Sequence, residues 1–412
     1  MTHKPSKKFD CVIAGGGYVG LSTAVAIKAS APHLNIMLVD AAPADAVNSD
    51  ERASAIAAAA SRMLDQLGLW QELVQEAQPI SEMIVTDSKT SDPVRPVFLT
   101  FGNAEEPETN EPFAHMVPNK AMIKALRAKA KVLKIELVHG DTVASFETND
   151  EKTNVTLGSG TSVSTRLLIA ADGVRSSLRD QAGIKTVHWT YDQMGIVSTV
   201  AHERPHNGRA EEHFLPGGPF ATLPLTGNRS SLVWTEPNDN AKRLMEADDF
   251  TFELELEKRF GHKLGEIEVA GSRKAFPLGL TLAREFVAPR FALVGDAAHG
   301  IHPIAGQGLN LGFKDAAALA QTIVEADRLG LDIGSITTLE RYQTWRRFDT
   351  VQMGVVTDVL NRLFSNDIGP LRMLRTVGLG IVDRLPALKN SFINQAAGRG
   401  HSNPALLNGE AI

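Results

Sequence analysis

The sequence has a single cysteine, Cys11, among its 412 residues. This scarcity excludes a disulfide framework and a cysteine-based zinc site, and it fits a reducing, cytosolic setting. Internal repeats, long low-complexity segments and a good transmembrane run are also missing. With a net charge of −6 and interspersed acids and bases, the composition gives no support for nucleic-acid binding. The length and the 43% hydrophobic content predict a soluble globular protein of two or three domains with a large core.

The N-terminal segment has some elements of a secretory signal, namely Lys7 and Lys8, an apolar middle and the small residues Ala29–Ala31. Asp10 and several glycines interrupt the apolar part, and this disfavours the signal interpretation. We therefore expect the segment to belong to the fold and the protein to be cytoplasmic. The two ends, residues 1–6 and about 398–412, are expected to be loosely ordered.

The strongest positive signal is a strand–glycine–helix unit near the N-terminus. Cys11–Ala14 is a short apolar run typical of a buried parallel strand, and an Ala-rich helical segment follows it. Between them lie three glycines with the spacing G-x-G-x-x-G: Gly15, Gly17 and Gly20. Such glycines allow a tight turn, a close approach of a pyrophosphate to the backbone, and close packing of helix on sheet. A second apolar strand, Asn35–Val39, leads to Asp40, where a carboxylate can bind ribose hydroxyls, so the sequence predicts a dinucleotide site.

Two further predicted strands end in an Asp beside a Gly. The run that starts at Leu167 ends in Asp172-Gly173, and Phe291–Val294 ends in Gly295-Asp296. An Asp at the carboxyl edge of a parallel sheet faces the crevice where ligands bind. Each Asp could instead cap the next helix. Because two of them occur in a chain that also has the glycine unit, the ligand-binding interpretation is favoured.

The segment after the second Asp contains another glycine-rich helix start. Gly306 and Gly308 open a helix predicted to run from Leu309 to about Ala326. Free N–H groups and the positive end of the helix dipole would stabilise electron density on a ring carbonyl or a reduced ring nitrogen. His299 and His302 lie three residues apart and could bind a metal, but no third ligand is evident, so we expect no metal site.

The helix predicted over Ala53–Leu67 has Arg52 at its start. Arg52 is either a solvated surface residue or a guanidinium that reaches a bound pyrophosphate, and the residues alone do not decide between the two. Asn119 is expected to cap the next helix. Further helices are predicted over Asn119–Val132, Asp248–Phe260 and Leu339–Leu363.

Alternating residues in the ranges 80–113 and 186–284 predict an antiparallel β domain, inserted into an α/β domain made of residues 1–79, 114–185 and 285–337. Inserts at this edge of a sheet commonly form the substrate pocket. Phe214, Phe220 and Trp234 are candidates for the pocket wall, although burial in the core is the commoner role for such residues. The remaining residues, 338–412, are predicted to be helical. Their amphipathic part, 371–385, suits packing on the core or a seat on a membrane surface.

Together these stretches resemble the flavin-dependent aromatic hydroxylases, the single-component FAD monooxygenases related to p-hydroxybenzoate hydroxylase. The resemblance rests on the glycine unit, on Asp172-Gly173 with Ser176 and Arg179, and on the segment from Gly295 to Asn310. The segments 357–367, 370–372 and 395–398 are similar to the ubiquinone-biosynthesis branch. The resemblance implies an α/β Rossmann-like FAD-binding domain, an inserted mostly antiparallel β-sheet substrate domain and C-terminal helices. It also implies hydroxylation of the aromatic ring of a polyprenyl phenol through a C4a-hydroperoxyflavin.

The resemblance further implies which residues hold FAD. Gly15, Gly17, Val19 and Gly20 would bind the pyrophosphate, and Asp40 would bind the adenosine ribose. Arg52 matches a flavin-binding arginine, Lys120 stands where the family often has arginine, and the backbone of Val143 would touch the adenine. Asp172 would serve both FAD and the reduced nicotinamide, and Asp296 would bind the ribityl chain. The isoalloxazine would meet the backbone of Gly306, Gln307, Gly308, Leu309 and Asn310, with Pro303 beside the ring.

The same resemblance implies O2 as co-substrate and NADH, NADPH or another donor as a transient reductant, since no second glycine-rich nucleotide fold is evident. A quinone-biosynthesis complex and the inner face of a membrane, reached through the C-terminal helices, are the implied partners. No side chain is identified as an acid or base. Two alternatives stay open: a soluble hydroxylase of a small aromatic acid, and an FAD protein without oxygenase activity, such as a prenyl-chain reductase or an assembly subunit.

Overall fold

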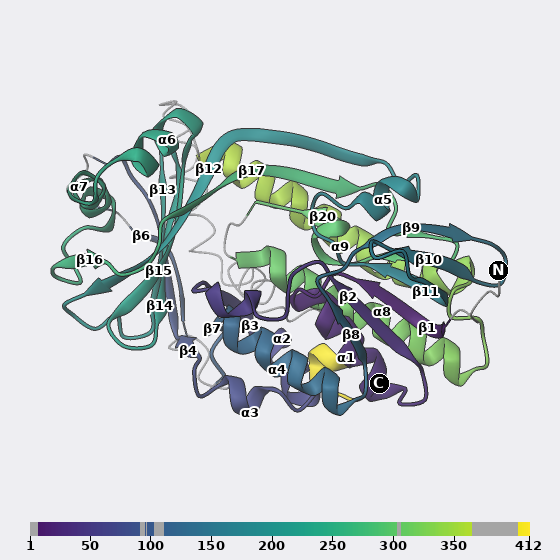
Figure 1. The fold of residues 1–412 in the computed structure, drawn as a ribbon. Coiled ribbons are helices and arrows are strands. Elements are labelled where there is room, and N and C mark those ends of the chain that lie inside the picture. The colour runs from purple at the N-terminus through teal and green to yellow at the C-terminus, as the bar shows by residue number, and fades with distance from the viewer. Residues whose placement is uncertain (1–6, 91–94, 96, 103–110, 303–305, 365–402) are drawn as a thin grey trace.

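The computed structural model describes residues 7–90, 95, 97–102, 111–302, 306–364 and 403–412. Two large β-sheets, of eight and nine strands, form the two lobes of the molecule (Figure 1). A three-stranded sheet lies between them and consists of β3 (Ala53–Ala57), β7 (Ala114–Pro118) and β4 (Gln78–Ile80). The boundaries predicted for the domains stay a prediction.

The eight-stranded sheet has a parallel centre. Its strands lie in the order β19 (Phe291–Leu293), β11 (Ser162–Ala170), β1 (Lys7–Ala14), β2 (Ile36–Asp40) and β8 (Glu136–His139), and every neighbouring pair is parallel. The short β18 (Val287–Ala288) and the hairpin of β9 (Val143–Thr148) and β10 (Thr153–Leu157) complete it in antiparallel pairings. The central strands are almost fully buried, as continuous apolar runs predict.

Helices cover this sheet. The helices α1 (Tyr18–Ser30), α4 (Asn119–Val132) and α8 (Gln307–Arg328) contribute to the same apolar core as its strands, and α1 packs between the other two. Because β1, β2, β11 and β19 are parallel, their carboxyl ends lie along one edge of the sheet. The predicted Asp residues therefore follow neighbouring strands at the same edge.

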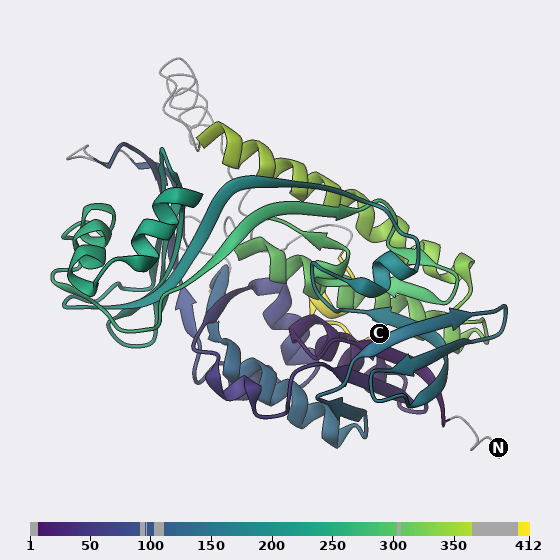
Figure 2. The same ribbon diagram turned by 45° about the horizontal axis from the view of Figure 1, so that its top comes forward.

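The nine-stranded sheet forms the other lobe. Its order is β20 (His299–Gly300), β17 (Lys274–Ala283), β12 (Thr186–His202), β15 (Arg229–Pro237), β14 (Gly218–Leu225), β13 (Arg209–Leu215), β5 (Glu82–Asp87) and β6 (Val97–Gly102), with β16 (Ile267–Val269) beside β12. All pairs are antiparallel except β13 with β5. The long strands β12 and β17 reach from one lobe to the other (Figures 1 and 2).

The two faces of this sheet differ in what covers them. The helices α6 (Asn238–Glu246) and α7 (Asp249–Phe260) pack on the outer face, where Phe220, Trp234 and Phe252 form a separate core. The inner face is turned towards the eight-stranded sheet. Since side chains alternate along a strand, residues next to Phe220 and Trp234 in sequence point to the inner face.

The chain departs from the predicted elements at one site-forming segment. The predicted helix over Ala53–Leu67 is wrong for its first five residues, which form β3, and α2 (Ala58–Gln66) begins only after them. Pairing of β3 with β7 overrides the helical preference of these Ala-rich residues. Asn119 is the first residue of α4 and not its cap, whereas Asp248 caps α7 by accepting a hydrogen bond from the backbone N–H of Thr251 at 2.7 Å.

In the described ranges, the remaining helices are α3 (Trp70–Leu73), α5 (Ser177–Gln181) and α9 (Ile336–Phe364), with 3₁₀ turns η1 (Ala46–Ser49), η2 (Gly295–Ala297) and η4 (Ala405–Asn408). The expectation of a loose C-terminus is wrong for residues 403–412, because Leu406 and Leu407 are buried against α2 and α8. The amphipathic segment 371–385 lies outside the described residues. Within the described part, every helix is too short or too polar to span a bilayer.

Candidate functional site

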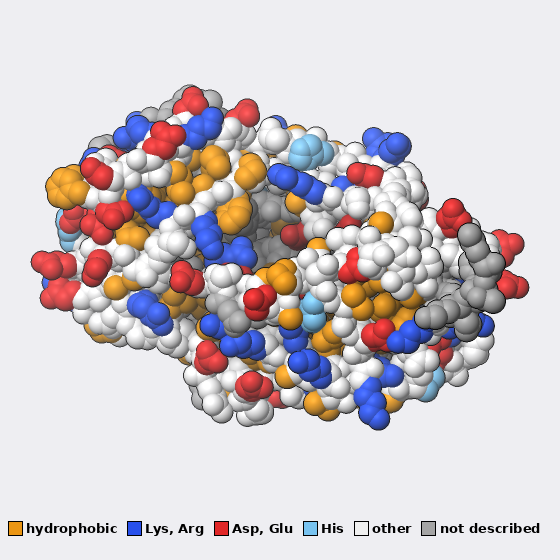
Figure 3. All heavy atoms as spheres, viewed as in Figure 1, with side chains coloured by type: hydrophobic (Ala, Val, Ile, Leu, Met, Phe, Trp, Pro, Cys, Tyr) orange, Lys and Arg blue, Asp and Glu red, His pale blue; other side chains and the backbone are white. Residues whose placement is uncertain are grey.

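A cavity of about 510 Å³ lies between the carboxyl edge of the eight-stranded sheet and the inner face of the nine-stranded sheet. The face of the molecule shown in Figure 3 has a hollow in its middle, between the lobes, with Lys and Arg side chains around the rim of the hollow. One wall comes from segments that the sequence singled out: Gly17–Gly20, Arg52–Ala55, Ala171, Gly173, Asp296, Gly306, Gly308 and Leu309. The opposite wall comes from Met83, Glu212, Ala221, Leu223 and Val233. The structure thus brings the three motif stretches to one cavity.

The glycine unit has the geometry that its sequence predicts. Gly15 has φ of +116°, and a Cβ there would lie 2.1 Å from the carbonyl oxygen of Ala171. A Cβ on Gly20 would lie 2.1 Å from the carbonyl oxygen of Gly15. A Cβ on Gly17 would meet nothing within 4 Å, so this glycine borders open space. Gly17 also precedes α1 without a side-chain cap, which leaves the first N–H groups of the helix, including that of Val19, available to an anion.

Asp40 and Asp296 lie on the same edge of the sheet, where β2 and β19 end. Asp40 is 8% exposed and sits beneath the glycine loop, against Gly16. Its carboxylate accepts hydrogen bonds from the backbone N–H of Ala42 at 3.2 Å and from Arg127 at 3.0 Å. Sequence reasoning missed Arg127, because nothing along α4 indicates which of its basic residues faces Asp40.

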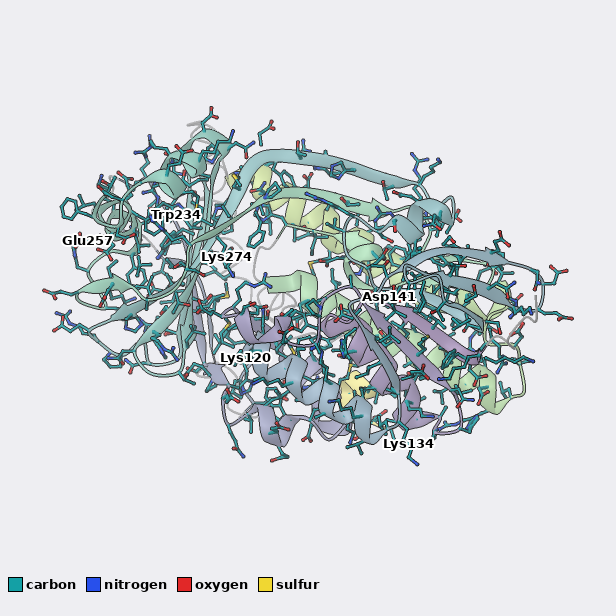
Figure 4. The ribbon with its side chains drawn as sticks, viewed as in Figure 1. Lys120, Lys134, Asp141, Trp234, Glu257 and Lys274 are labelled. Carbon is teal, nitrogen blue, oxygen red and sulfur yellow. The ribbon has the colours of Figure 1, made fainter. Side chains whose placement is uncertain are left out.

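Arg52 lies on the cavity wall and is held in place by Asp50. Its Nε and Nη2 each donate to one oxygen of Asp50 at 2.8 Å, and the same carboxylate accepts from Tyr18 and Asn119 at 3.3 Å. Although partial burial alone would raise the pKa of Asp50, the hydrogen bonds and charge of Arg52 lower it to about 2. The guanidinium is therefore paired with an ionised carboxylate, and the Arg52 side chain, which lines the cavity, is still 48% exposed. Lys120, labelled in Figure 4, is half-buried on α4 and does not line the cavity.

The loop after β11 presents a carboxylate oxygen that lacks a partner. Asp172 Oδ1 is buried and accepts no hydrogen bond from the described residues, while Oδ2 accepts only a long one, 3.5 Å, from the N–H of Leu178. Ser176 caps α5 by accepting from the N–H of Arg179 at 3.0 Å. The buried guanidinium of Arg179 donates to the carbonyl oxygens of Val174 and Ala297 at 3.1 and 3.0 Å. Arg179 thus ties the Asp172 loop to the Asp296 loop.

Asp296 and the start of α8 form the far end of the cavity. Asp296 belongs to η2 and is exposed on the cavity side. Desolvation by the surrounding protein raises the pKa of its carboxyl, and the charge of His299 opposes that rise. Gly306 adopts the left-handed conformation, with φ of +64°, and precedes α8 without a side-chain cap. Among the described residues, no side chain therefore caps the first N–H groups of α8, and the same holds for α1.

Other predicted site residues have different surroundings. Asn310 accepts from the N–H of Ala57 at 2.9 Å and donates to the carbonyl oxygens of Ala55 and Gly306 at 3.0 and 3.1 Å, so its side chain joins α8 to β3. Gln307 begins α8. Val143, at the start of β9, is buried and does not line the cavity. Pro303 lies outside the described residues.

A buried charge network supports the Asp296 loop. Asp315 Oδ2 contacts His299 Nε2 at 2.5 Å and accepts from the N–H of Gly295 at 2.9 Å, while Oδ1 accepts from Arg346 at 2.8 Å. Burial alone would raise the pKa of Asp315, but His299 and Arg346 lower it. Asp315 and Arg346 were missed by sequence reasoning. Each is a charged residue within an otherwise apolar face of its helix, α8 or α9, and this position in the sequence could have indicated a buried ion pair.

The two histidines that were considered as metal ligands, His299 and His302, contact different partners. His299 contacts Asp315, whereas His302 is buried against Tyr191, with ring centroids 5.4 Å apart. Burial lowers the pKa of His302 to about 4, so it is neutral. In the described ranges, no three His, Cys, Asp or Glu side chains are grouped so that they could hold a metal ion.

The aromatic candidates for the substrate pocket lie away from the cavity lining. Phe220 and Trp234 pack edge to face, 5.8 Å apart, on the outer face of the sheet, in the lobe where Figure 4 labels Trp234. Phe214 is buried with Val85 and Leu99. Their surroundings favour the interpretation as core residues. Within the described part of the chain, the strand residues that do line the cavity are small or apolar, with one exception, Glu212, which sequence reasoning missed.

Comparison with known proteins gives consistent matches over most of the chain. The profile of a family described as "FAD binding domain" matches residues 8–347. The ubiquinone hydroxylase UbiL of Rhodospirillum rubrum is 41% identical over 416 residues, which cover 99% of this chain and 95% of that protein. The 3-demethoxyubiquinol 3-hydroxylase of Escherichia coli is 32% identical, with 97% and 100% covered. The crystal structure of p-nitrophenol 4-monooxygenase PnpA from Pseudomonas putida shares the fold, with a TM-score of 0.78, 18% identity, and 96% and 99% of the two chains covered.

Proposed function

Because the chain belongs to the FAD binding domain family of flavin-dependent aromatic hydroxylases, we propose that it hydroxylates the ring of a polyprenyl phenol in ubiquinone biosynthesis. The observation that carries the proposal is the single cavity in which the glycine unit, the Asp172 loop, the Asp296 loop and the start of α8 meet an apolar sheet face. The names of the two relatives, a ubiquinone hydroxylase and a 3-demethoxyubiquinol 3-hydroxylase, support the same substrate class.

The residues present fit FAD. The open space at Gly17, the free N–H groups of α1 and the guanidinium of Arg52 suit a pyrophosphate, and Asp40 suits the adenosine ribose. Asp296 would hold the ribityl chain, and the free N–H groups of α8 would face the isoalloxazine. When bound and reduced, FAD supplies the activation of O2 for transfer of one oxygen atom to an electron-rich ring. The protein orients the ring and excludes water.

We propose NADH or NADPH as the transient reductant. Asp172 Oδ1 has no hydrogen-bond partner among the described residues, and this supports a further polar ligand at this edge of the sheet. We also propose peripheral contact with a membrane, where a polyprenyl substrate resides. The outer face of α9 exposes four apolar side chains at helical spacing, Phe348, Val351, Val355 and Val359, and α9 lies on the surface (Figure 2).

The cavity favours a neutral phenol over a small aromatic acid. Arg52 is the only cationic side chain among the described residues that line it, and Arg52 is already paired with Asp50. A substrate carboxylate would have no partner on the sheet wall and would face Glu212. Burying such a charge without a partner is costly.

The decisive experiment is mass spectrometry of quinone intermediates in a strain that lacks the gene and has no paralogue. We expect a precursor to accumulate that lacks one or more ring hydroxyls, and we expect the purified protein to be yellow with bound FAD. Normal quinone in that strain would contradict the pathway. A protein whose reduced flavin reacts only slowly with O2 when substrate is present would instead be an FAD protein without oxygenase activity.

A further inference from the structure

Glu212 is the one charged side chain that the nine-stranded sheet presents to the cavity within the described residues. It lies on β13, directly opposite Ala221 of β14 and Val85 of β5. The row continues through Val233 and Val197 and ends at Lys274, which Figure 4 labels on the side of the sheet that faces the rest of the molecule. A carboxylate is therefore set into an otherwise apolar wall, opposite the segments that would hold FAD.

The carboxylate of Glu212 has no partner in the part of the chain that the structure describes. It is only 4% exposed, yet no side chain or backbone group there donates a hydrogen bond to it. The preceding residue, Glu211, has the opposite situation: it faces the other way and contacts Lys263 at 2.6 Å and His213 at 3.3 Å. A buried polar group without a partner is costly, so its presence at a cavity wall indicates a ligand.

The charged groups around Glu212 do not compensate the negative charge of its carboxylate. Among the described residues, the other ionisable groups that line the cavity are Tyr18, Arg52 and Asp296, and Arg52 is paired with Asp50. On the packed strands, β14 contributes Ala221, and β5 contributes Val85, with Asp87 two positions further on. Burial raises the pKa of Glu212 to about 7, so both protonation states are populated near neutral pH.

We infer that Glu212 receives the hydroxyl group of a neutral phenol in this cavity, as hydrogen-bond acceptor when the substrate binds and as proton acceptor when the ring is hydroxylated. The inference deepens the proposed function and rests on it. A phenol oxygen donates one hydrogen, and an ionised carboxylate is its strongest acceptor.

The proton transfer is balanced within the site. The O–H bond of the phenol breaks, a new O–H bond forms on the carboxylate, and the electron pair left on the phenolate oxygen spreads into the ring. The ring becomes richer in electrons and is attacked more readily by the oxidant that O2 supplies in the proposed reaction. The protonated carboxyl then returns its proton to the oxygen of the product. The hydrogen displaced from the ring carbon leaves as a proton and ends in the water formed from the second oxygen atom of O2, so Glu212 is neither oxidised nor reduced.

The same arrangement determines specificity. A methyl ether of the phenol has no hydrogen to donate and would leave the buried carboxylate unpaired. Sites that hold a buried hydrogen-bonding group discriminate strongly against analogues that lack its partner. We therefore expect the FAD-loaded protein to bind a short-chain prenyl phenol at least tenfold more tightly than its methyl ether.

The test compares Glu212→Gln with Glu211→Gln, a matched substitution on the outer side of the same strand. Each FAD-loaded protein is assayed with a short-chain prenyl phenol for product formation between pH 5 and 9, and for equilibrium binding of the phenol and its methyl ether. For Glu212→Gln we expect unchanged flavin absorbance, about a 100-fold lower kcat, and loss of the rise in kcat near pH 7. We also expect the preference for phenol over ether to fall to below threefold. Glu211→Gln should retain the wild-type kcat, pH profile and preference.

The outcomes separate the inference from the proposed function. A wild-type kcat and pH profile in Glu212→Gln would overturn the role of Glu212 and leave the hydroxylase assignment intact. A wild-type protein that binds the phenol selectively but forms no hydroxylated product would overturn the hydroxylase assignment. Should Glu212→Gln fail to fold, Glu212→Asp serves instead. A weaker preference for phenol over ether than in wild type, together with a shifted pH profile, supports the inference. A preference and a pH profile that match wild type overturn it.

Discussion

Glu212 also makes a prediction about stability that is independent of catalysis. Burial raises the pKa of this carboxyl from its ordinary value of 4.5 to about 7 in the folded protein. An acid with a raised pKa contributes stability that is fully present below its unfolded pKa and is lost as the pH rises through its folded pKa. The side chain is almost fully buried, so the difference between the two values corresponds to about 3 kcal/mol.

The assay is denaturant unfolding of wild type and Glu212→Gln, with saturating FAD, at several pH values from 4 to 8. At pH 4 both side chains are uncharged, and we expect nearly equal free energies of unfolding. By pH 8 wild type carries a buried charge that Gln lacks, and we expect Glu212→Gln to be more stable by about 3 kcal/mol. The difference should grow mainly between pH 5 and 7.

Glu211→Gln is the matched control, and its effect on the free energy of unfolding should have the opposite sign. Burial alone would raise the pKa of Glu211, but His213 and Lys263 lower it to about 2. Its contribution is present above the unfolded pKa and is lost as the pH falls, so Glu211→Gln should be less stable than wild type at pH 7 and approach it at low pH. A stability difference between Glu212→Gln and wild type that stays constant from pH 4 to 8 would refute the reasoning.

Three further predictions concern other parts of the molecule. Gly17→Ala should keep the wild-type melting temperature but bind FAD more weakly, as thermal melts and FAD titration would show. In the same assays Gly20→Ala should fold poorly, because its Cβ would meet a carbonyl oxygen at 2.1 Å. Arg346→Met should lower the free energy of unfolding by about 3–5 kcal/mol in denaturant titrations, since it leaves Asp315 buried with one partner fewer. Replacing Phe348 and Val355 by Ser should reduce flotation with liposomes and leave hydroxylation of a short-chain phenol unchanged, if α9 contacts the membrane.

The sequence was informative about the cofactor edge because its signals are local. The glycine unit, Asp40, Asp172 and Asp296 each follow an apolar strand, and parallel strands bring their carboxyl ends to one edge. Nothing about distant partners was needed to place them together. The prediction of one shared cavity therefore required only strand type and direction.

The sequence was less informative where distant partners decide. Residues 53–57 became a strand because β7 was available to pair with them, although their composition favours a helix. The partners of Asp40 and Asp315, namely Arg127 and Arg346, lie on helices far along the chain. A pattern of spacing along one helix shows which face is apolar, but it does not show which charge on another element will meet it.

Glu211 and Glu212 show that limit within one strand. Alternation along β13 requires that one of two adjacent glutamates face the solvent side and the other the cavity. The sequence does not show which, because the choice follows from the register of β13 against β14 and β5. A slip by one residue would exchange the two carboxylates, pairing Glu212 with the basic outer side and placing Glu211 in the apolar wall. The position of the carboxylate that we infer to receive the phenol is thus set by strand register, which only the assembled sheet determines.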